Sequence, residues 1–214
     1  NGKVKSTGNT TLSGAAVKTI GSLGELTLSG TANTLTGGDV TNQGKFIKAG
    51  GATTTDIQAK FDSTGTLTAD AGTLKLSGGG KSSNAVSVSS GAKLQVATTD
   101  YTFENAALSG AGEIELTGAK TTFKNTSGSA KVSVNGGNLE FDATLSTLGT
   151  LALTSGSVTN STGGSADVAG LEWTGGSLNG KVKSTGNATL SGAAAKTIGS
   201  LGELTLSGTA NTLT

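Results

Sequence analysis

Residues 1–36 read NGKVKSTGNTTLSGAAVKTIGSLGELTLSGTANTLT, and residues 179–214 read NGKVKSTGNATLSGAAAKTIGSLGELTLSGTANTLT. The copies differ at two pairs of positions, Thr10 against Ala188 and Val17 against Ala195. The period is therefore 178 residues. Self-similarity at a fixed period is the signature of repeat architectures. We expect a window of a tandem array, with residues 1–178 as one full solenoid repeat and residues 179–214 as the start of the next, continuous with the first.

The composition is dominated by small residues: glycine, serine and threonine make up 98 of 214 residues. Such a bias is typical of disordered segments and flexible linkers. Two features oppose that interpretation, because the net charge is only +1 and Leu, Val, Ile and Phe recur in short alternating runs. Alternation predicts strands, threonine favours them, and glycine permits tight corners between them.

Five residue types are absent: Cys, His, Arg, Pro and Met. Without cysteine there is no disulfide framework or thiolate metal site, and without histidine the commonest general base is missing. All 15 basic residues are lysine and the charge is nearly balanced, so we expect no nucleic-acid binding. A chain that avoids proline can use its backbone N–H groups in sheet ladders. No apolar run approaches the ~18–20 residues of a membrane helix, so we expect no span in this segment.

The predicted strands are short, and most end at glycine or asparagine. In each, apolar residues lie two apart, so one side faces inward and the other outward. They lie at residues 10–14, 25–30, 45–50, 65–69, 72–78, 85–88, 93–96, 112–118, 131–136, 138–142, 149–153 and 171–175. No window has the periodicity of a sustained amphipathic helix, and the one short candidate, residues 15–20, is bounded by glycine. We therefore predict no significant helix.

Short strands with glycine corners fit either a β-sandwich or a β-solenoid. Asn-Gly hairpin signals are few, at Asn1, Asn135 and Asn179, whereas a sandwich needs a hairpin between most strand pairs. The 178-residue period is also long for one small sandwich, and no linker separates the copies. We therefore predict a parallel β-solenoid. A coil of ~22 residues would give about eight coils and a rise of roughly 40 Å per period.

Four phrases carry a resemblance to a known class of proteins. They are TNQGKF (residues 41–46), FDSTGTLTADAGTLKLSGGG (61–80), LSGAGEIELTGA (108–119) and LEWTGGSLNGKVKSTGNATLSG (171–192). They resemble the degenerate coils of filamentous-hemagglutinin-like and autotransporter-passenger-like bacterial proteins, and the resemblance covers nearly the whole chain. It implies a right-handed parallel β-helix, here of about eight to ten coils, at the bacterial cell surface in an adhesive or fibre-forming role. The resemblance does not identify any catalytic residue in this sequence.

Two pairs of acidic residues have a spacing that glycosidases use. Glu113 and Glu115, like Glu140 and Asp142, lie two apart on one strand, which places their carboxyls ~7 Å apart. Because Ile114 takes the inward side between the first two, we expect these acids to point into solvent. An exposed acid lacks the burial that raises the pKa of a proton donor.

Two further features suggest sites but are weak. Residues 37–39 and 163–167 approach the G-G-x-G-x-D-x-U-x calcium coil without completing it. Trp173 shares the parity of Leu171, so we predict a place in the core rather than on a sugar-stacking surface. We accordingly predict no catalytic, cofactor-binding or metal-ligating residues, and no cofactor.

These expectations describe a non-enzymatic, extracellular structural repeat of a bacterial fibre or giant adhesin that assembles end to end by stacking of β-coils. Bare strand edges are templates for further pairing, and natural solenoids normally carry polar caps, which neither end of this sequence provides. The expected partners are adjacent repeats or subunits, with cell-surface glycans as a further candidate. Two alternatives stay open: a carbohydrate-active β-helix of the tailspike or lyase kind, and the stem of an adhesin whose binding tip lies elsewhere.

Overall fold

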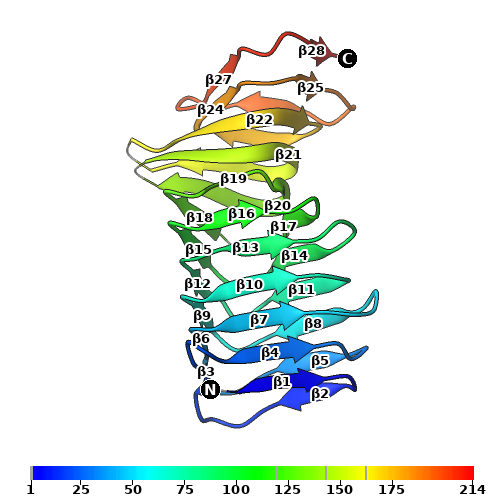
Figure 1. The fold of residues 1–214 in the computed structure, drawn as a ribbon. Helices are drawn as coiled ribbons and strands as arrows, with labels where there is room; N and C mark the ends of the chain where they lie inside the picture. Colours follow the sequence, from blue (N-terminus) through cyan, green and yellow to red (C-terminus); the bar gives the residue numbers. More distant parts are fainter. Residues whose placement is uncertain (1, 119, 143, 162) are drawn as a thin grey trace.

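The chain winds into a β-solenoid of about ten turns, with the N-terminal end at the bottom of Figure 1 and the C-terminal end at the top. The computed structural model describes residues 2–118, 120–142, 144–161 and 163–214. Within these ranges the paired strands are parallel and no residue is helical. The predicted all-β parallel solenoid is therefore confirmed.

Most turns place one short strand on each of three faces (Figure 1). The first face contains β1 (Lys3–Ser6), β4 (Glu25–Leu28), β7 (Lys45–Lys48), β10 (Thr66–Ala69), β13 (Val86–Val88), β16 (Ala107–Ser109), β19 (Ser127–Gly128), β24 (Lys181–Ser184) and β27 (Glu203–Leu206). The second contains β2 (Thr10–Leu12), β5 (Asn33–Leu35), β8 (Thr54–Ile57), β11 (Thr73–Leu76), β14 (Lys93–Val96), β17 (Glu113–Leu116), β25 (Ala188–Leu190) and β28 (Asn211–Leu213). The third contains β3 (Lys18–Ile20), β6 (Val40–Asn42), β9 (Phe61–Ser63), β12 (Gly80–Ser82), β15 (Tyr101–Glu104), β18 (Lys120–Lys124), β23 (Gly176–Asn179) and β26 (Lys196–Ile198).

Three longer strands run round the corners between faces. They are β20 (Lys131–Asp142), β21 (Leu145–Asn160) and β22 (Ser165–Trp173). β20 pairs with β17 on the second face and with β18 on the third, so it covers both. The strands predicted at residues 131–136 and 138–142 are thus one bent strand. Its ladder with β21 shifts register at Asn135, where the positive φ of Gly136 lets the backbone turn without ending the pairing.

The two copies of the repeat occupy equivalent places in the solenoid. Strands β24–β28 begin and end 178 residues after β1–β5. Along the described first face, β1 is followed by β4, β7, β10, β13, β16, β19 and the starts of β21 and β22 before β24, which makes nine coils. The mean coil is therefore about 20 residues, shorter than expected, and the rise per period is roughly 43 Å. The period contains a whole number of coils, so equivalent residues of the two copies lie on the same face of the solenoid.

The core is built from inward side chains that stack in register from coil to coil. On the second face one such ladder continues through Leu35, Ile57, Leu76, Val96, Leu116, Val134, Leu153, Trp173, Leu190 and Leu213. The intervening residues of these strands point outward, as the alternation predicts. Each side chain of a ladder covers the apolar surface of the side chain on the coil below. A residue of the ladder is therefore fully buried only where its coil has a neighbouring coil on both sides.

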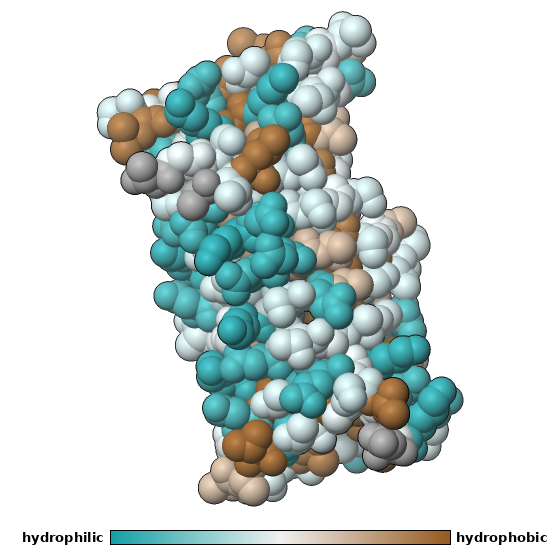
Figure 2. All heavy atoms as spheres, turned by 60° about the vertical axis from the view of Figure 1, so that its left-hand side comes forward, coloured by the Kyte–Doolittle hydropathy of each residue, from teal (hydrophilic) through white to brown (hydrophobic). Residues whose placement is uncertain are grey.

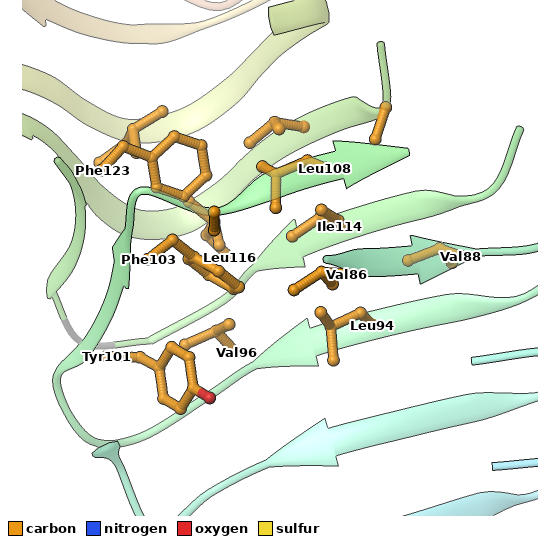
Figure 3. Close-up of a cluster of buried hydrophobic side chains, with 14 of the residues drawn as sticks. Val86, Val88, Leu94, Val96, Tyr101, Phe103, Leu108, Ile114, Leu116 and Phe123 are labelled. Atoms are coloured by element: carbon orange, nitrogen blue, oxygen red, sulfur yellow. The ribbon is translucent and has the colours of Figure 1, made fainter. Parts of the chain in front are cut away.

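Aromatic rings form a column inside the third face (Figure 3). Phe103 lies 5.1 Å from Tyr101 and 5.3 Å from Phe123, and Phe123 lies 6.1 Å from Phe141, measured between ring centroids. The phenylalanine pairs meet edge to face, the arrangement that ring quadrupoles favour. All four rings are buried, and the Tyr101 hydroxyl hydrogen-bonds Ser82 at 2.7 Å. This column anchors the middle of the solenoid.

Candidate functional site

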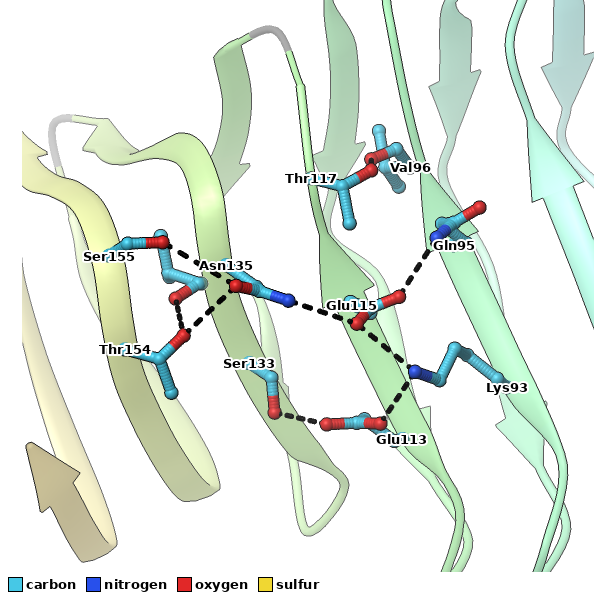
Figure 4. Close-up of polar contacts among 11 residues, drawn as sticks. Lys93, Gln95, Val96, Glu113, Glu115, Thr117, Ser133, Asn135, Thr154 and Ser155 are labelled. Atoms are coloured by element: carbon cyan, nitrogen blue, oxygen red, sulfur yellow. Dashed lines mark hydrogen bonds and ion pairs between the residues drawn. The ribbon is translucent and has the colours of Figure 1, made fainter. Parts of the chain in front are cut away.

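The acidic pair on β17 is part of a polar network that crosses several coils (Figure 4). Lys93 Nζ lies 3.1 Å from Glu113 Oε2 and 3.1 Å from Glu115 Oε1. Gln95 donates to Glu115, and Ser133 donates to Glu113. Ile114 is buried between the two acids, so their outward direction is confirmed. Both carboxylates are nevertheless partly covered rather than freely solvated, because neighbouring coils hold their partners beside them.

The protonation of Glu113 is set by opposing effects. Partial burial opposes ionisation, but hydrogen bonds from Ser133 and Lys93 and the charges of Lys93 and Lys131 outweigh it and hold the pKa of Glu113 below 4.5. A carboxyl with a lowered pKa is a poor proton donor near neutral pH. Its environment is the opposite of the one that raises the pKa of a glycosidase acid.

This environment predicts a pH-dependent contribution of Glu113 to stability. A folded-state pKa below the unfolded value stabilises the fold at pH values above the unfolded pKa, and the gain is lost as pH falls through the folded pKa. Glu113→Gln should therefore be destabilising at pH 7 and progressively less so at acid pH, as the pH falls through the lowered folded-state pKa of Glu113. Thermal unfolding of both proteins across this range measures the difference. An equal difference at neutral and at acid pH would contradict the assignment.

The second acidic pair is also engaged by its neighbours. Glu140 Oε1 lies 2.9 Å from Lys120 Nζ, and Asp142 Oδ1 accepts a hydrogen bond of 2.6 Å from Ser161. The near-calcium stretch at residues 163–167 ends at Asp167, which pairs in register with Lys183. In the part of the chain that the structure describes, no three His, Cys, Asp or Glu side chains are grouped as a metal site would require.

Trp173 points into the core, as its two-residue spacing from Leu171 predicted. Its side chain is buried in the second-face ladder between Leu153 and Leu190. The indole Nε1 donates a 2.9 Å hydrogen bond to the Gly175 carbonyl, which satisfies its polar edge. The predicted core position is confirmed, and this ring has no exposed face on which a sugar could stack.

Two lysines have environments that the sequence pattern does not reveal. Lys48 points inward on β7 between Leu28 and Ala69, and its Nζ donates a 2.6 Å hydrogen bond to Gly50 O. Burial lowers the pKa of Lys48. Lys18 Nζ donates to four backbone carbonyls, those of residues 14, 16, 36 and 38, at 3.0–3.4 Å. The oxygens of residues 36 and 38 come from the next coil, so a complete carbonyl cage requires that coil.

The largest exposed apolar side chains lie mainly at the two ends of the solenoid. Figure 2 shows hydrophobic atoms gathered near its lower and upper ends. At the N-terminal end they are Val4, Val17 and Leu23, and at the C-terminal end Ile198, Leu201, Leu206 and Leu213. At the N-terminal end a hollow lined by Val4, Leu12, Ile20, Leu26, Leu35 and Val40 opens into the core. Apolar coil edges that an adjacent coil buries, as at Val182 and Leu35, are therefore a stronger candidate for a functional surface than the acidic pairs.

The described residues contain no helix long and apolar enough to cross a membrane. Comparison of the chain with protein-family models, with curated proteins and with solved structures gives no match. The likeness to hemagglutinin-like and autotransporter-passenger-like coils is therefore carried by the coil pattern alone. At the level that the fold supports, the chain is a β-solenoid built of stacked coils with an internal repeat.

Proposed function

We propose that this chain is a non-enzymatic structural segment of an extracellular bacterial surface fibre or giant adhesin, joined end to end by stacking of β-coils. The coil pattern shared with filamentous-hemagglutinin-like and autotransporter-passenger-like repeats supports the extracellular, fibre-forming role. The stacking of the second copy of the repeat on β22 and β23 supports the mode of assembly, because parallel strand edges pair readily with further strands. An interface that joins unlike ends in one direction generates an open filament rather than a closed oligomer.

One observation carries the proposal: the same residues occur in two environments within one chain. The lower edge of the repeat is bare in its first copy and covered in its second, so Val4 is 60% exposed whereas its equivalent Val182 is 2% exposed. The upper edge is covered in the first copy and bare in the second, so Leu35 is fully buried whereas Leu213 is 81% exposed. Each end thus carries apolar residues that the same sequence buries when a further coil is present.

The structure of a joint between repeats is present inside the chain. There β24, β25 and β26 lie on β22 and β23, with Val182 opposite Ala166 and Ala188 opposite Leu171. The sequence of β1, β2 and β3 matches that of β24, β25 and β26 except for Thr10 in place of Ala188. The lower end of one repeat is therefore suited to the upper end of another in the same orientation.

A chain cut to one period tests the proposal. Residues 1–178 form nine coils, with β1–β3 at one end and β22–β23 at the other, so all three faces can pair between molecules. We expect linear polymers whose subunits repeat every roughly 43 Å, seen by sedimentation velocity and electron microscopy. Val4→Asp in this fragment should keep it monomeric, because the joint would bury an unpaired carboxylate against Ala166. A compact, β-rich fragment that stays monomeric at all concentrations without that change would refute end-to-end stacking.

The alternative of a carbohydrate-active β-helix has less support. Such an enzyme needs one acid with a raised pKa beside an ionised partner, whereas Glu113 and Glu115 share the charge of Lys93. The adhesin-stem alternative uses the same coils and joints. It differs from the proposal only in what the rest of the parent protein would carry.

A further inference from the structure

We infer that the first face is a surface for lateral self-association, on which two copies of this chain pack face to face and antiparallel about a two-fold axis along β16. This contact goes beyond the proposed function, because it joins solenoids side by side and involves no strand edge. Three features of the face support it: a run of coils without charge, an exposed leucine, and charged residues whose signs match across the axis.

The first face carries no charged residue over five successive coils (Figure 1). On β10, β13, β16, β19 and residues 145–148 of β21, the outward residues are serine, threonine and alanine, together with Leu145. Four of these coils are charged on their other two faces, at Lys75, Lys93, Glu113 and Lys131 on the second and at Lys81, Glu104, Lys120 and Glu140 on the third. Charged residues are depleted from the centres of protein interfaces. The neutral part of the first face therefore has the composition of an interface centre.

Outward residues of successive coils lie in line along this face. One line runs from Lys45 through Thr66, Ala107, Ser127 and Thr147 to Asp167. Lys45 on β7 is three coils below Ala107, and Asp167 on β22 is three coils above it. A two-fold axis along β16 therefore brings Lys45 of one copy opposite Asp167 of the other. Because such a contact is isologous, the pair occurs twice.

The next coil on each side repeats the match with the signs exchanged. Glu25 lies beside Lys45 on the coil below, and Lys183 lies beside Asp167 on the coil above. Each is four coils from β16, so the same axis places Glu25 opposite Lys183, again twice. The side chains of Lys45 and Asp167 have no hydrogen-bond or ion-pair partner among the described residues, so a second copy can supply one. A parallel alignment without offset would instead oppose like charges.

Leu145 lies at the margin of the neutral coils and is 51% exposed. Within the part of the chain that the structure describes, it is the one large apolar side chain so exposed outside the first coil and the last two. Leu145 lies two coils above β16 and two residues before Thr147. The antiparallel contact therefore places it against Thr64 of the second copy, two coils below β16 and two residues before Thr66. Burial of this side chain favours association.

The contact is expected to be weak between two single chains. The nine coils from β4 to β24 form a strip roughly 43 Å long and ~13 Å wide, so two copies bury roughly 1,100 Å² in total. This area is at the low end for specific interfaces, and exposed ion pairs add little to it. We expect a dimer that dissociates as salt is raised. In a longer array the same face would recur with each repeat, and many weak contacts would act together.

Engineered cysteines on the central line test the alignment, because the chain contains no cysteine. Ala107→Cys lies on the axis, so a short bis-maleimide that spans the ~10 Å between packed sheets should join it to its own copy. Thr66→Cys and Thr147→Cys lie two coils below and above β16. Neither should crosslink alone, because like cysteines would be ~19 Å apart along the axis, whereas a mixture of the two should give dimers. Thr122→Cys, on the third face of the same coil, is the control and should give none.

Charge reversal tests the ion pairs. Lys45→Glu should raise the dimer dissociation constant about tenfold, because two attractive pairs become repulsive. Asp167→Lys should have the same effect, and the two changes together should restore the affinity to within about twofold. Lys81→Glu, on the third face, is the matched control and should leave the affinity unchanged. Sedimentation equilibrium of the full chain measures all four.

Three results would overturn the inference: a chain that stays monomeric at millimolar concentration, a dimer that Lys45→Glu does not weaken, or crosslinking of Thr66→Cys to its own copy, which would mean a parallel alignment. End-to-end assembly would survive each of them, because it depends on coil edges and not on the first face. A monomeric 1–178 fragment would in turn count against end-to-end stacking, while crosslinked dimers of the full chain would still support lateral association.

Discussion

Replacing Phe103 with alanine is expected to lower the free energy of unfolding by about 3–5 kcal/mol. The ring is fully buried and touches aromatic rings on both sides, Tyr101 and Phe123, so truncation leaves a cavity in the middle of the column. The strands that carry these rings are locked in register above and below, which limits collapse around the gap. The loss should therefore lie near the upper end of values for buried phenylalanine.

Chemical denaturation followed by circular dichroism and by the fluorescence of Trp173 measures this loss. Trp173 lies several coils above Phe103, so coincident transitions report that the stack unfolds as one unit, and separate transitions report local opening near the cavity. Phe103→Leu is the matched control and should cost less than about 1.5 kcal/mol, because it keeps most of the apolar volume. Equal midpoints for the alanine and leucine variants would contradict the packing described here.

Gly80→Ala is expected to destabilise the fold by about 3 kcal/mol or more. Gly80 begins β12 with φ +122°, and a Cβ there would lie 2.1 Å from the Phe61 carbonyl oxygen. Phe61 and Tyr101 are its register partners on the coils below and above. The clash is with backbone, so it can be relieved only by moving a neighbouring coil. The same denaturation assay measures the effect.

Gly91→Ala separates steric clash from backbone strain. Gly91 also has a positive φ, +77°, but no atom lies within 4 Å of the Cβ position. The substitution should cost only the ~1–2 kcal/mol of placing an L-residue in the left-handed region. A loss at Gly80 no larger than the loss at Gly91 would show that the coils separate more easily than the register suggests.

The sequence predicted about half of the short strands of the first and second faces and none of the short strands of the third. First- and second-face strands such as β4 and β17 hold two apolar residues two apart, the pattern that identifies a strand. The third-face strands went unpredicted, because several are three residues long with polar residues pointing inward. Asn42 donates a 2.9 Å hydrogen bond to Ser63, and both are buried. Buried polar side chains of this kind find their hydrogen-bond partners on the next coil, so hydrophobic alternation along the sequence does not reveal their strands.

The residues of the candidate site were likewise predicted only in part from the sequence. The sequence identified Glu113 and Glu115 and their outward direction, but not Lys93 between them, which lies 20 residues away along the chain and one coil away in space. Lys48 was not identified either, since its burial depends on the coils on both sides. Contacts between coils join residues about one turn apart, and the length of each turn varies too much to be counted from the sequence.

By itself, the sequence determined that this protein is an all-β solenoid with a 178-residue repeat, because period-2 alternation, glycine corners and the duplicated block are local properties of the chain. Only the tertiary structure decided that the repeat spans nine coils and that the two copies share the same faces. It also decided that identical residues are bare at one end and buried at the other. The physical reason is that coil length and burial are set by pairing with the adjacent coil, and no residue specifies its neighbour one turn away.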